Sequence, residues 1–131
     1  MRIAISMLAL IAIPGAALAL ASARLPSALA QPGLWEVTKS AKGSRDDRQC
    51  LGDPAILAQW EHRKEQCTRV VVSASGDKAE VHYTCPKGGF GTSKITVLTP
   101  RSVKIETQGI SDGLPFSYVL HARLAGNCPS R

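Results

Sequence analysis

The sequence predicts a mainly β fold, in which a single small antiparallel sheet of about seven strands curves into a sandwich or barrel-like form. One short helix and disulfide staples complete this prediction. Apolar and polar residues alternate over 103–107 and 116–124, which is typical of a sheet with one buried face. The connections between predicted strands are short, which favours antiparallel neighbours. Four cysteines in an exported chain of this size indicate a disulfide framework.

The beginning of the chain has the pattern of a secretory signal. Met1-Arg2 is a short positive segment, and an uncharged run follows it from Ile3 to Ala23. Small residues allow cleavage after Ala23, so we expect a signal peptide over 1–23 (alternative end 30) and a single domain over 31–131. An uncleaved membrane anchor competes with this interpretation, because ~20 apolar residues can span a bilayer. We favour a cleaved signal and a periplasmic protein that is not an integral membrane protein once processed.

The first part of the predicted domain contains two strands and the helix. Trp35 and Val37 alternate with polar residues in a strand over 32–38, and a polar, edge-like strand follows over 45–50. The helix is predicted over 53–61, since Asp53 can cap its start and Pro54 suits its first position.

A β-hairpin is predicted between Cys67 and Cys85, because two β-rich arms flank Gly76. Pairing with the apex at Gly76 places the two cysteines opposite each other, within reach of a disulfide. A two-residue loop centred between Gly76 and Asp77 instead places them on opposite faces, unless a bulge intervenes. The register therefore stays open at this point.

The rest of the chain supplies the remaining strands. A loop is expected over 86–91 and a second loop over 108–114, and Asp112-Gly113 within the latter is a turn. The remaining strands are predicted over 93–98, 103–107 and 116–124.

The cysteines allow three pairings, of which we rank one first. Cys67 with Cys85 is favoured because the ends of a hairpin are neighbours in any topology, and Cys50 with Cys128 follows by elimination. The second choice pairs Cys50 with Cys67 and Cys85 with Cys128.

Charge excludes one class of function. The chain has 16 Lys and Arg against 10 Asp and Glu, so the domain is mildly basic. Acidic residues interleave the basic ones between Lys39 and Arg48, and no aromatic residues occur among them, so we expect no nucleic-acid partner. A solvated surface is the simplest interpretation, with contact to an envelope protein, a lipid or an anionic polymer as the alternative.

No residues group into a recognisable catalytic or metal site. His82 and Cys85 lie three positions apart in a predicted strand and so point to opposite faces, and an oxidised Cys67 cannot donate a thiolate. Ser111-Asp112 has no histidine placed beside it by the sequence. We therefore predict no catalytic residues, no metal and no cofactor.

Several short motifs together resemble a known bacterial exported family, DUF3617, a domain of unknown function. These motifs are Pro32-Gly33-Leu34-Trp35-Glu36, Cys50-Leu51, Cys67 and Cys85 around a hairpin, and Gly126-Asn127-Cys128. The resemblance covers nearly all of the predicted domain and implies an exported, disulfide-bearing β domain. It implies no catalytic residue.

We expect a non-catalytic binding or structural module of the cell envelope. If part of the apolar sheet face is left open, an acyl chain or an apolar segment can bind there, with Trp35, Phe116 and Tyr118 as candidate lining. A sheet that closes on itself, with no such opening, is an equal alternative. The other function class is a small periplasmic enzyme or metal-binding protein whose site the sequence does not reveal.

Overall fold

The computed structural model describes Gly15, residues 23–39 and residues 47–129. Most of the predicted signal peptide and residues 45 and 46 of the second predicted strand lie outside the described residues. Two 3-10 helices and seven strands make up the described fold. They are η1 (Ser27–Ala30), β1 (Gly33–Thr38), β2 (Asp47–Leu51), η2 (Pro54–His62), β3 (Thr68–Ser75), β4 (Lys78–Thr84), β5 (Phe90–Thr99), β6 (Ser102–Ser111) and β7 (Leu114–Gly126).

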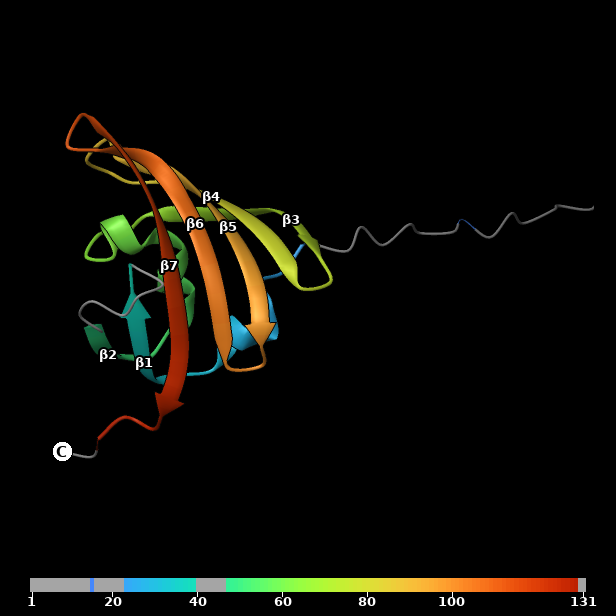
Figure 1. Ribbon diagram of the computed structural model, residues 1–131. Helices are drawn as coiled ribbons and strands as arrows, with labels where there is room; N and C mark the ends of the chain where they lie inside the picture. Colours follow the sequence, from blue (N-terminus) through green and yellow to red (C-terminus); the bar gives the residue numbers. More distant parts are fainter. Residues whose placement is uncertain (1–14, 16–22, 40–46, 130–131) are drawn as a thin grey trace, which may run out of the picture.

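The seven strands form one antiparallel sheet, in the order β2-β1-β7-β6-β5-β4-β3. Figure 1 shows the sheet with β2 and β3 at its two ends. The order leaves these two strands as the edges of an open sheet. The prediction of a mainly β, antiparallel fold with seven strands is confirmed, whereas the prediction of a sandwich or barrel-like closure is wrong.

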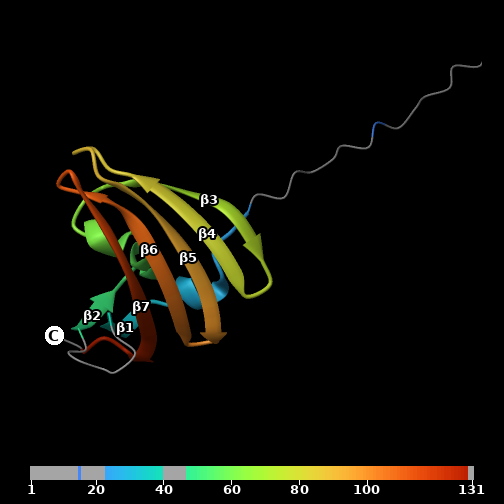
Figure 2. The ribbon, with the colours of Figure 1, turned by 45° about the horizontal axis from the view of Figure 1, so that its top comes forward.

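Both short helices lie on the same face of the sheet, as Figures 1 and 2 show, and they explain why it does not close. Leu57, Ala58 and Trp60 of η2 are buried in the hydrophobic core together with Ala28 and Leu29 of η1. They cover the inner side chains of the strands, so no second sheet is required. The sequence predicts η2 but not η1, which lies before residue 31, where the predicted domain begins.

Strand patterning follows the sequence closely. Val103, Ile105 and Thr107 are buried on the inner face of β6, and Leu120, Ala122 and Leu124 continue that face on β7. The predicted loop over 108–114 is shorter than expected, because β6 and β7 extend to a two-residue turn. Asp112 and Gly113 both have positive φ values, 51° and 77°, which is the conformation of a type I′ hairpin turn.

The β3–β4 hairpin combines both of the registers that the sequence left open. Ser75 pairs with Lys78 across a two-residue loop, and the register then shifts between Val71 and Ser73. This bulge places Thr68 opposite Thr84, so that Cys67, which precedes Thr68, meets Cys85, which follows Thr84. The disulfides are Cys67–Cys85 and Cys50–Cys128, with Cα–Cα distances of 4.2 and 5.6 Å. These are the pairs that the sequence analysis ranked first.

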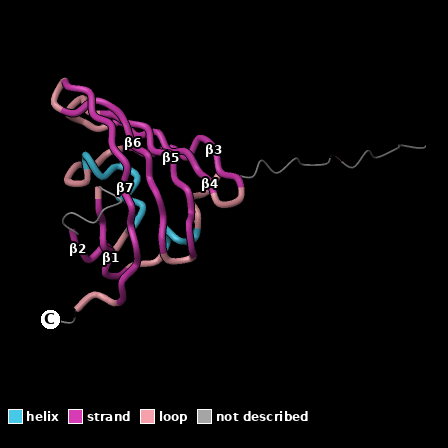
Figure 3. Tube along the Cα trace, in the orientation of Figure 1, coloured by secondary structure: helices cyan, strands magenta, loops and turns pink. Residues whose placement is uncertain are grey.

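The helix after β2, shown in cyan in Figure 3, forms where it was predicted. It has the 3-10 form. Asp53 caps it by accepting a hydrogen bond from the Ala55 amide at 3.1 Å, and Pro54 is its first residue. Gln59 has a non-helical conformation, and its side chain donates to the carbonyl oxygens of His62 and Glu65. In the part of the chain that the structure describes, neither helix is long and apolar enough to cross a membrane.

Candidate functional site

The outer face of the sheet, opposite η1 and η2, presents polar side chains in register across its strands. Glu80, Lys94 and Glu106 form a row in which each residue is the cross-strand partner of the next, and we call this the charge row. Opposite charges in directly facing positions stabilise a sheet. A parallel row runs through Lys78, Thr96, Lys104 and His121, and we call it the basic row.

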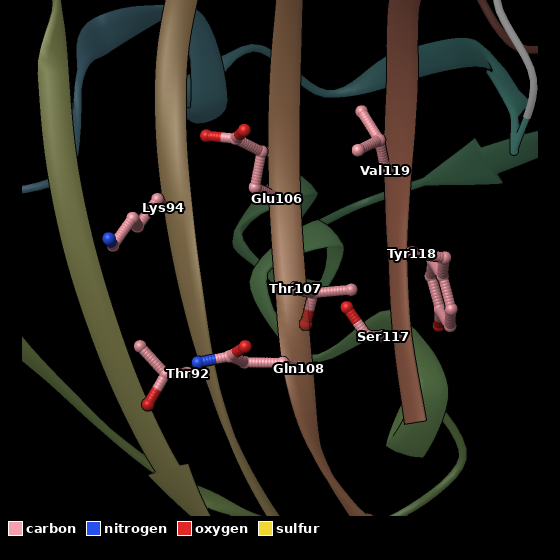
Figure 4. Close-up of a pocket in the computed structure, with 8 residues that line it drawn as sticks. All are labelled: Thr92, Lys94, Glu106, Thr107, Gln108, Ser117, Tyr118 and Val119. Carbon is pink, nitrogen blue, oxygen red and sulfur yellow. The ribbon is translucent and has the colours of Figure 1, made fainter. Parts of the chain in front are cut away.

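A shallow cavity of about 490 Å³ lies over β5, β6 and β7 on this face (Figure 4). Lys94 and Glu106 from the charge row form one side of it, and Figure 4 shows Gln108 extending toward Thr92. Five of the residues that line it, Thr92, Lys94, Glu106, Gln108 and Ser117, have polar side chains on the outer face, which offer both donors and acceptors. The lining residues are Thr92, Lys94, Glu106, Thr107, Gln108, Ser117, Tyr118 and Val119.

Two further depressions extend this surface to both sides. A cavity of about 410 Å³ over β3, β4 and β5 shares Lys94 and Glu106 with the first, so the two are continuous. A third, of about 300 Å³, lies between β6, β7 and β1 and includes His121 and Arg123. The described part of the outer face therefore carries adjoining shallow depressions, lined by both polar and apolar atoms.

The described part of the outer face carries more basic than acidic side chains. Glu36 accepts from Arg48 at 2.9 Å and from Arg123 at 2.5 Å, and only 12% of its side chain is exposed, so its charge is neutralised locally. Lys104 Nζ lies 3.9 Å from Glu106 Oε1, too far for a hydrogen bond. Basic side chains outnumber acidic ones on the described part of this face, with Arg48, Lys78, Lys94, Lys104 and Arg123 against Glu36, Glu80 and Glu106.

A second group of polar side chains, which we call the inner cluster, is buried between the end of η2 and the sheet. It consists of His62, Glu65, Tyr83 and Cys85. His62 is 5% exposed, and its Nδ1 lies 2.9 Å from the Tyr83 hydroxyl. Burial raises the pKa of Tyr83, and the negative charge of Glu61 raises it further. The phenol therefore stays protonated and bonds to the imidazole as a neutral group.

The hydroxyl of the neighbouring Tyr118 is also hydrogen-bonded to a side chain of η2. Its hydroxyl donates to Glu61 Oε2 at 2.8 Å. Burial is the main cause that raises the pKa of Tyr118, and the hydrogen bond to Glu61 adds to it. Lys39 Nζ lies 4.2 Å from the centre of the Tyr118 ring, a distance typical of a cation–π contact.

Two glycines make room for the aromatic rings of this region. Gly91 and Gly109 face each other across β5 and β6, in a row that runs from Tyr83 to Phe116. A Cβ atom on Gly91 would lie 2.6 Å from the Tyr83 hydroxyl oxygen. A side chain there would displace the hydroxyl that bonds to His62.

The structure divides the three residues predicted to line an apolar opening. Trp35 is fully buried, and its Nε1 donates to the Gln31 carbonyl at 3.0 Å. Phe116 and Tyr118 are neighbours with ring centres 5.8 Å apart. Trp35 pairs with Leu124 of β7, six residues beyond Tyr118, which places it about 20 Å from that ring along the strand. The three side chains therefore do not form one surface.

The metal-ligand combination considered from the sequence does not come together. The His82 side chain is 52% exposed on the outer face, 3.8 Å from Glu80, whereas Cys85 is buried on the inner side. A different group of possible ligands does come together with Cys85. The donor atoms of His62, Glu65 and Cys85 all lie within 4.8 Å of one another. Sequence reasoning missed this group, although the spacing His62-x-x-Glu65-x-Cys67 was visible.

The serine and histidine candidates are also dispersed. Ser111 ends β6 and Asp112 forms the turn after it. His121 lies in the basic row on the outer face, and His62 is buried on the inner face. The outer-face position of His121 agrees with the predicted alternation in the last strand.

Comparison with known proteins gives a family and no activity. A family model described as "Protein of unknown function (DUF3617)" matches residues 30–128. No curated protein and no solved structure matches the chain.

Proposed function

The chain belongs to the DUF3617 family, whose description assigns no activity, and we propose that it is an exported, non-catalytic binding module of the cell envelope. Its ligand surface, in this proposal, is the outer face of the sheet, and its partner is an anionic polymer such as an acidic polysaccharide. The two disulfides suggest that the protein resides in an oxidising compartment, which supports export.

One observation carries this proposal: η1 and η2 cover the inner face (Figure 1), whereas no described helix covers the outer face, over which adjoining shallow depressions lie. The basic row and Lys94 give this face an excess of positive charge, which attracts anionic groups. Thr92, Gln108 and Ser117 supply hydroxyl and amide groups that can bond to sugar hydroxyls. Length favours a polymer, because adjoining shallow depressions fit a chain better than a small molecule.

An acyl chain is a less well supported ligand than an anionic polymer. Trp35 is enclosed in the core, and the Tyr118 hydroxyl is engaged by Glu61, so neither side chain lines an apolar channel. An apolar dye and lipid analysis of the purified protein test this directly. Strong dye binding together with co-purified lipid would favour the acyl-chain hypothesis over the polymer.

The test uses the chain from residue 24 and polygalacturonate as an acidic polysaccharide, with uncharged dextran for comparison. We expect polygalacturonate to bind with an affinity that falls as salt rises, and dextran not to bind. The Lys94→Gln/Lys104→Gln variant should bind about tenfold more weakly, since each lysine beside an anionic surface contributes about 1 kcal/mol before screening.

A matched control variant has the same net charge as the Lys94→Gln/Lys104→Gln variant. Lys64→Gln/Lys87→Gln removes two exposed lysines that lie outside the sheet strands, beyond η2 and between β4 and β5. This variant should retain nearly full affinity. Equal loss in both double variants would mean that net charge alone attracts the polymer, and it would contradict a ligand surface on the outer face.

A further inference from the structure

We propose that reduction of the Cys67–Cys85 disulfide turns the inner cluster into a zinc(II) site. The four ligands are the thiolates of Cys67 and Cys85, the imidazole of His62 and the carboxylate of Glu65. This inference is independent of the proposed polymer binding, because it concerns the opposite face of the sheet.

The donor atoms already lie close together. One donor atom from each of His62, Glu65 and Cys85 lies within 4.8 Å of the others, and Cys67 is joined to Cys85 by the disulfide. Zinc is bound tetrahedrally at about 2.0 to 2.3 Å by nitrogen, oxygen and sulfur ligands. Small side-chain movements therefore suffice to close the donor atoms around one ion.

Glu65 offers a carboxylate oxygen as a ligand atom. Its Oε1 is buried and has no hydrogen-bond partner among the described residues. A buried carboxylate oxygen without a partner is costly, and a cation beside it removes that cost. Glu65 therefore has a ligand atom that no other described group uses.

His62 is oriented as a ligand. A neutral imidazole can donate from Nδ1 to the Tyr83 oxygen at 2.9 Å, which leaves the Nε2 lone pair free for a metal. Such an outer hydrogen bond is the usual support of a metal-binding histidine. Nε2 packs beside Gly89, where a Cβ would lie 2.2 Å away, so any other residue at position 89 would occupy the space next to this nitrogen.

The surrounding structure holds the ligands and admits the ion. Gln59, 1% exposed, donates to the carbonyl oxygens of His62 and Glu65 at 3.0 Å each and so fixes the segment that bears both ligands. A surface depression of about 250 Å³, lined by Glu65 and Cys67 among others, opens toward the disulfide. It gives a reductant or an ion a route from solvent.

The chemistry balances with a phosphine as reductant. The phosphine supplies two electrons that break the sulfur–sulfur bond, and it takes an oxygen atom from water to become a phosphine oxide. The two protons of that water pass to the sulfurs. Zinc then displaces one proton from each thiol and binds the two thiolates.

Cobalt(II) reports the site, because thiolate ligation gives it charge-transfer absorption and tetrahedral geometry gives it visible absorption. The chain from residue 24 is titrated with cobalt(II) and then zinc(II), oxidised and after phosphine reduction. We expect the reduced protein to bind one equivalent of cobalt, which zinc displaces, and the oxidised protein to give no such spectrum. An absent spectrum in the reduced protein, or an equal one in the oxidised protein, overturns the proposal.

Variants separate the site from other thiols. Cys67→Ser/Cys85→Ser keeps Cys50 and Cys128 and should lose the cobalt spectrum after reduction. Glu65→Gln preserves shape and should weaken cobalt binding by at least about tenfold, the lower end of what a supporting group contributes. A spectrum that survives Cys67→Ser/Cys85→Ser overturns the site.

Circular dichroism covers the case in which the reduced chain unfolds. If cobalt or zinc restores the β-sheet signal only where Cys67 and Cys85 are present, the site is supported, because metal binding then drives folding. If the reduced chain unfolds and gives neither the spectrum nor recovered structure, the proposal fails.

Discussion

Ser93 joins the sheet to the helix that covers it, and its removal should measure how firmly that cover is held. The side chain has no exposed surface, and its hydroxyl donates to the Ala58 carbonyl of η2 at 2.6 Å. It also lies 2.9 Å from the Thr107 hydroxyl of the neighbouring strand. In Ser93→Ala, the Ala58 carbonyl oxygen and the Thr107 hydroxyl oxygen both lose the serine hydroxyl as a partner, at a position with no exposed surface.

The expected cost is about 2 kcal/mol of unfolding free energy, since each buried bond contributes about 1 kcal/mol net and an unpaired buried group costs more. For a domain of this size that corresponds to a fall of roughly 10 °C in Tm. Adding Thr107→Val removes one of the orphaned hydroxyls. The double variant should therefore lose less than the sum of the single variants, by about 1 kcal/mol.

Urea unfolding with the disulfides intact, followed by circular dichroism, measures these differences. Ser117→Ala is the matched control: the same substitution on the exposed outer face should change stability by no more than about 0.5 kcal/mol. If Ser93→Ala changed stability as little as the control, the bond to η2 would not contribute and the reasoning would be refuted.

Two further predictions concern the N-terminus and pH. Leu29 is 2% exposed, so the chain from residue 24 should be about 2 kcal/mol more stable than the chain from residue 31 in urea unfolding, and exported protein should start at Arg24 by intact mass. Equal stability of the two chains would contradict this. Tyr83 and Tyr118 are the two tyrosines of the chain, and both have raised pKa values in the fold, so the unfolded chain loses these protons first. The contribution of these two tyrosines to stability should therefore be constant below the ordinary tyrosine pKa of 10.0 and fall above it, with phenolate absorbance appearing only as the protein unfolds; a native titration near 10.0 would argue against burial.

Features encoded in local patterns were predictable from the sequence. The alternation over 103–107 and 116–124 identified the inner faces of β6 and β7, because side chains in a strand point alternately to its two sides. Asp53 and Pro54 identified the start of η2. The disulfide pairs followed from the nearness of hairpin ends and from elimination.

Features that depend on contacts between distant segments were not predictable. The bulge between Val71 and Ser73 has no special residue to mark it, although it decides the register at Cys67. The approach of Glu65 to His62 and Cys85 depends on the non-helical turn at Gln59, for which helix periodicity gives no signal. The two larger outer depressions are each lined by side chains from at least three neighbouring strands, and no single motif encodes them.

The prediction of a closed sheet was wrong because this protein covers its apolar face and protects its sheet edges by separate means. A closed barrel covers the apolar face and removes the sheet edges. Here η1 and η2 cover the face, and a disulfide secures each edge: Cys50 lies in the edge strand β2 and Cys67 directly precedes the edge strand β3. Each bridge stabilises a domain by about 2 to 4 kcal/mol, mainly by restricting the unfolded chain. Because the helices and disulfides secure the core and the edges, the outer face does not have to pack against another layer, and this leaves its side chains accessible to a ligand.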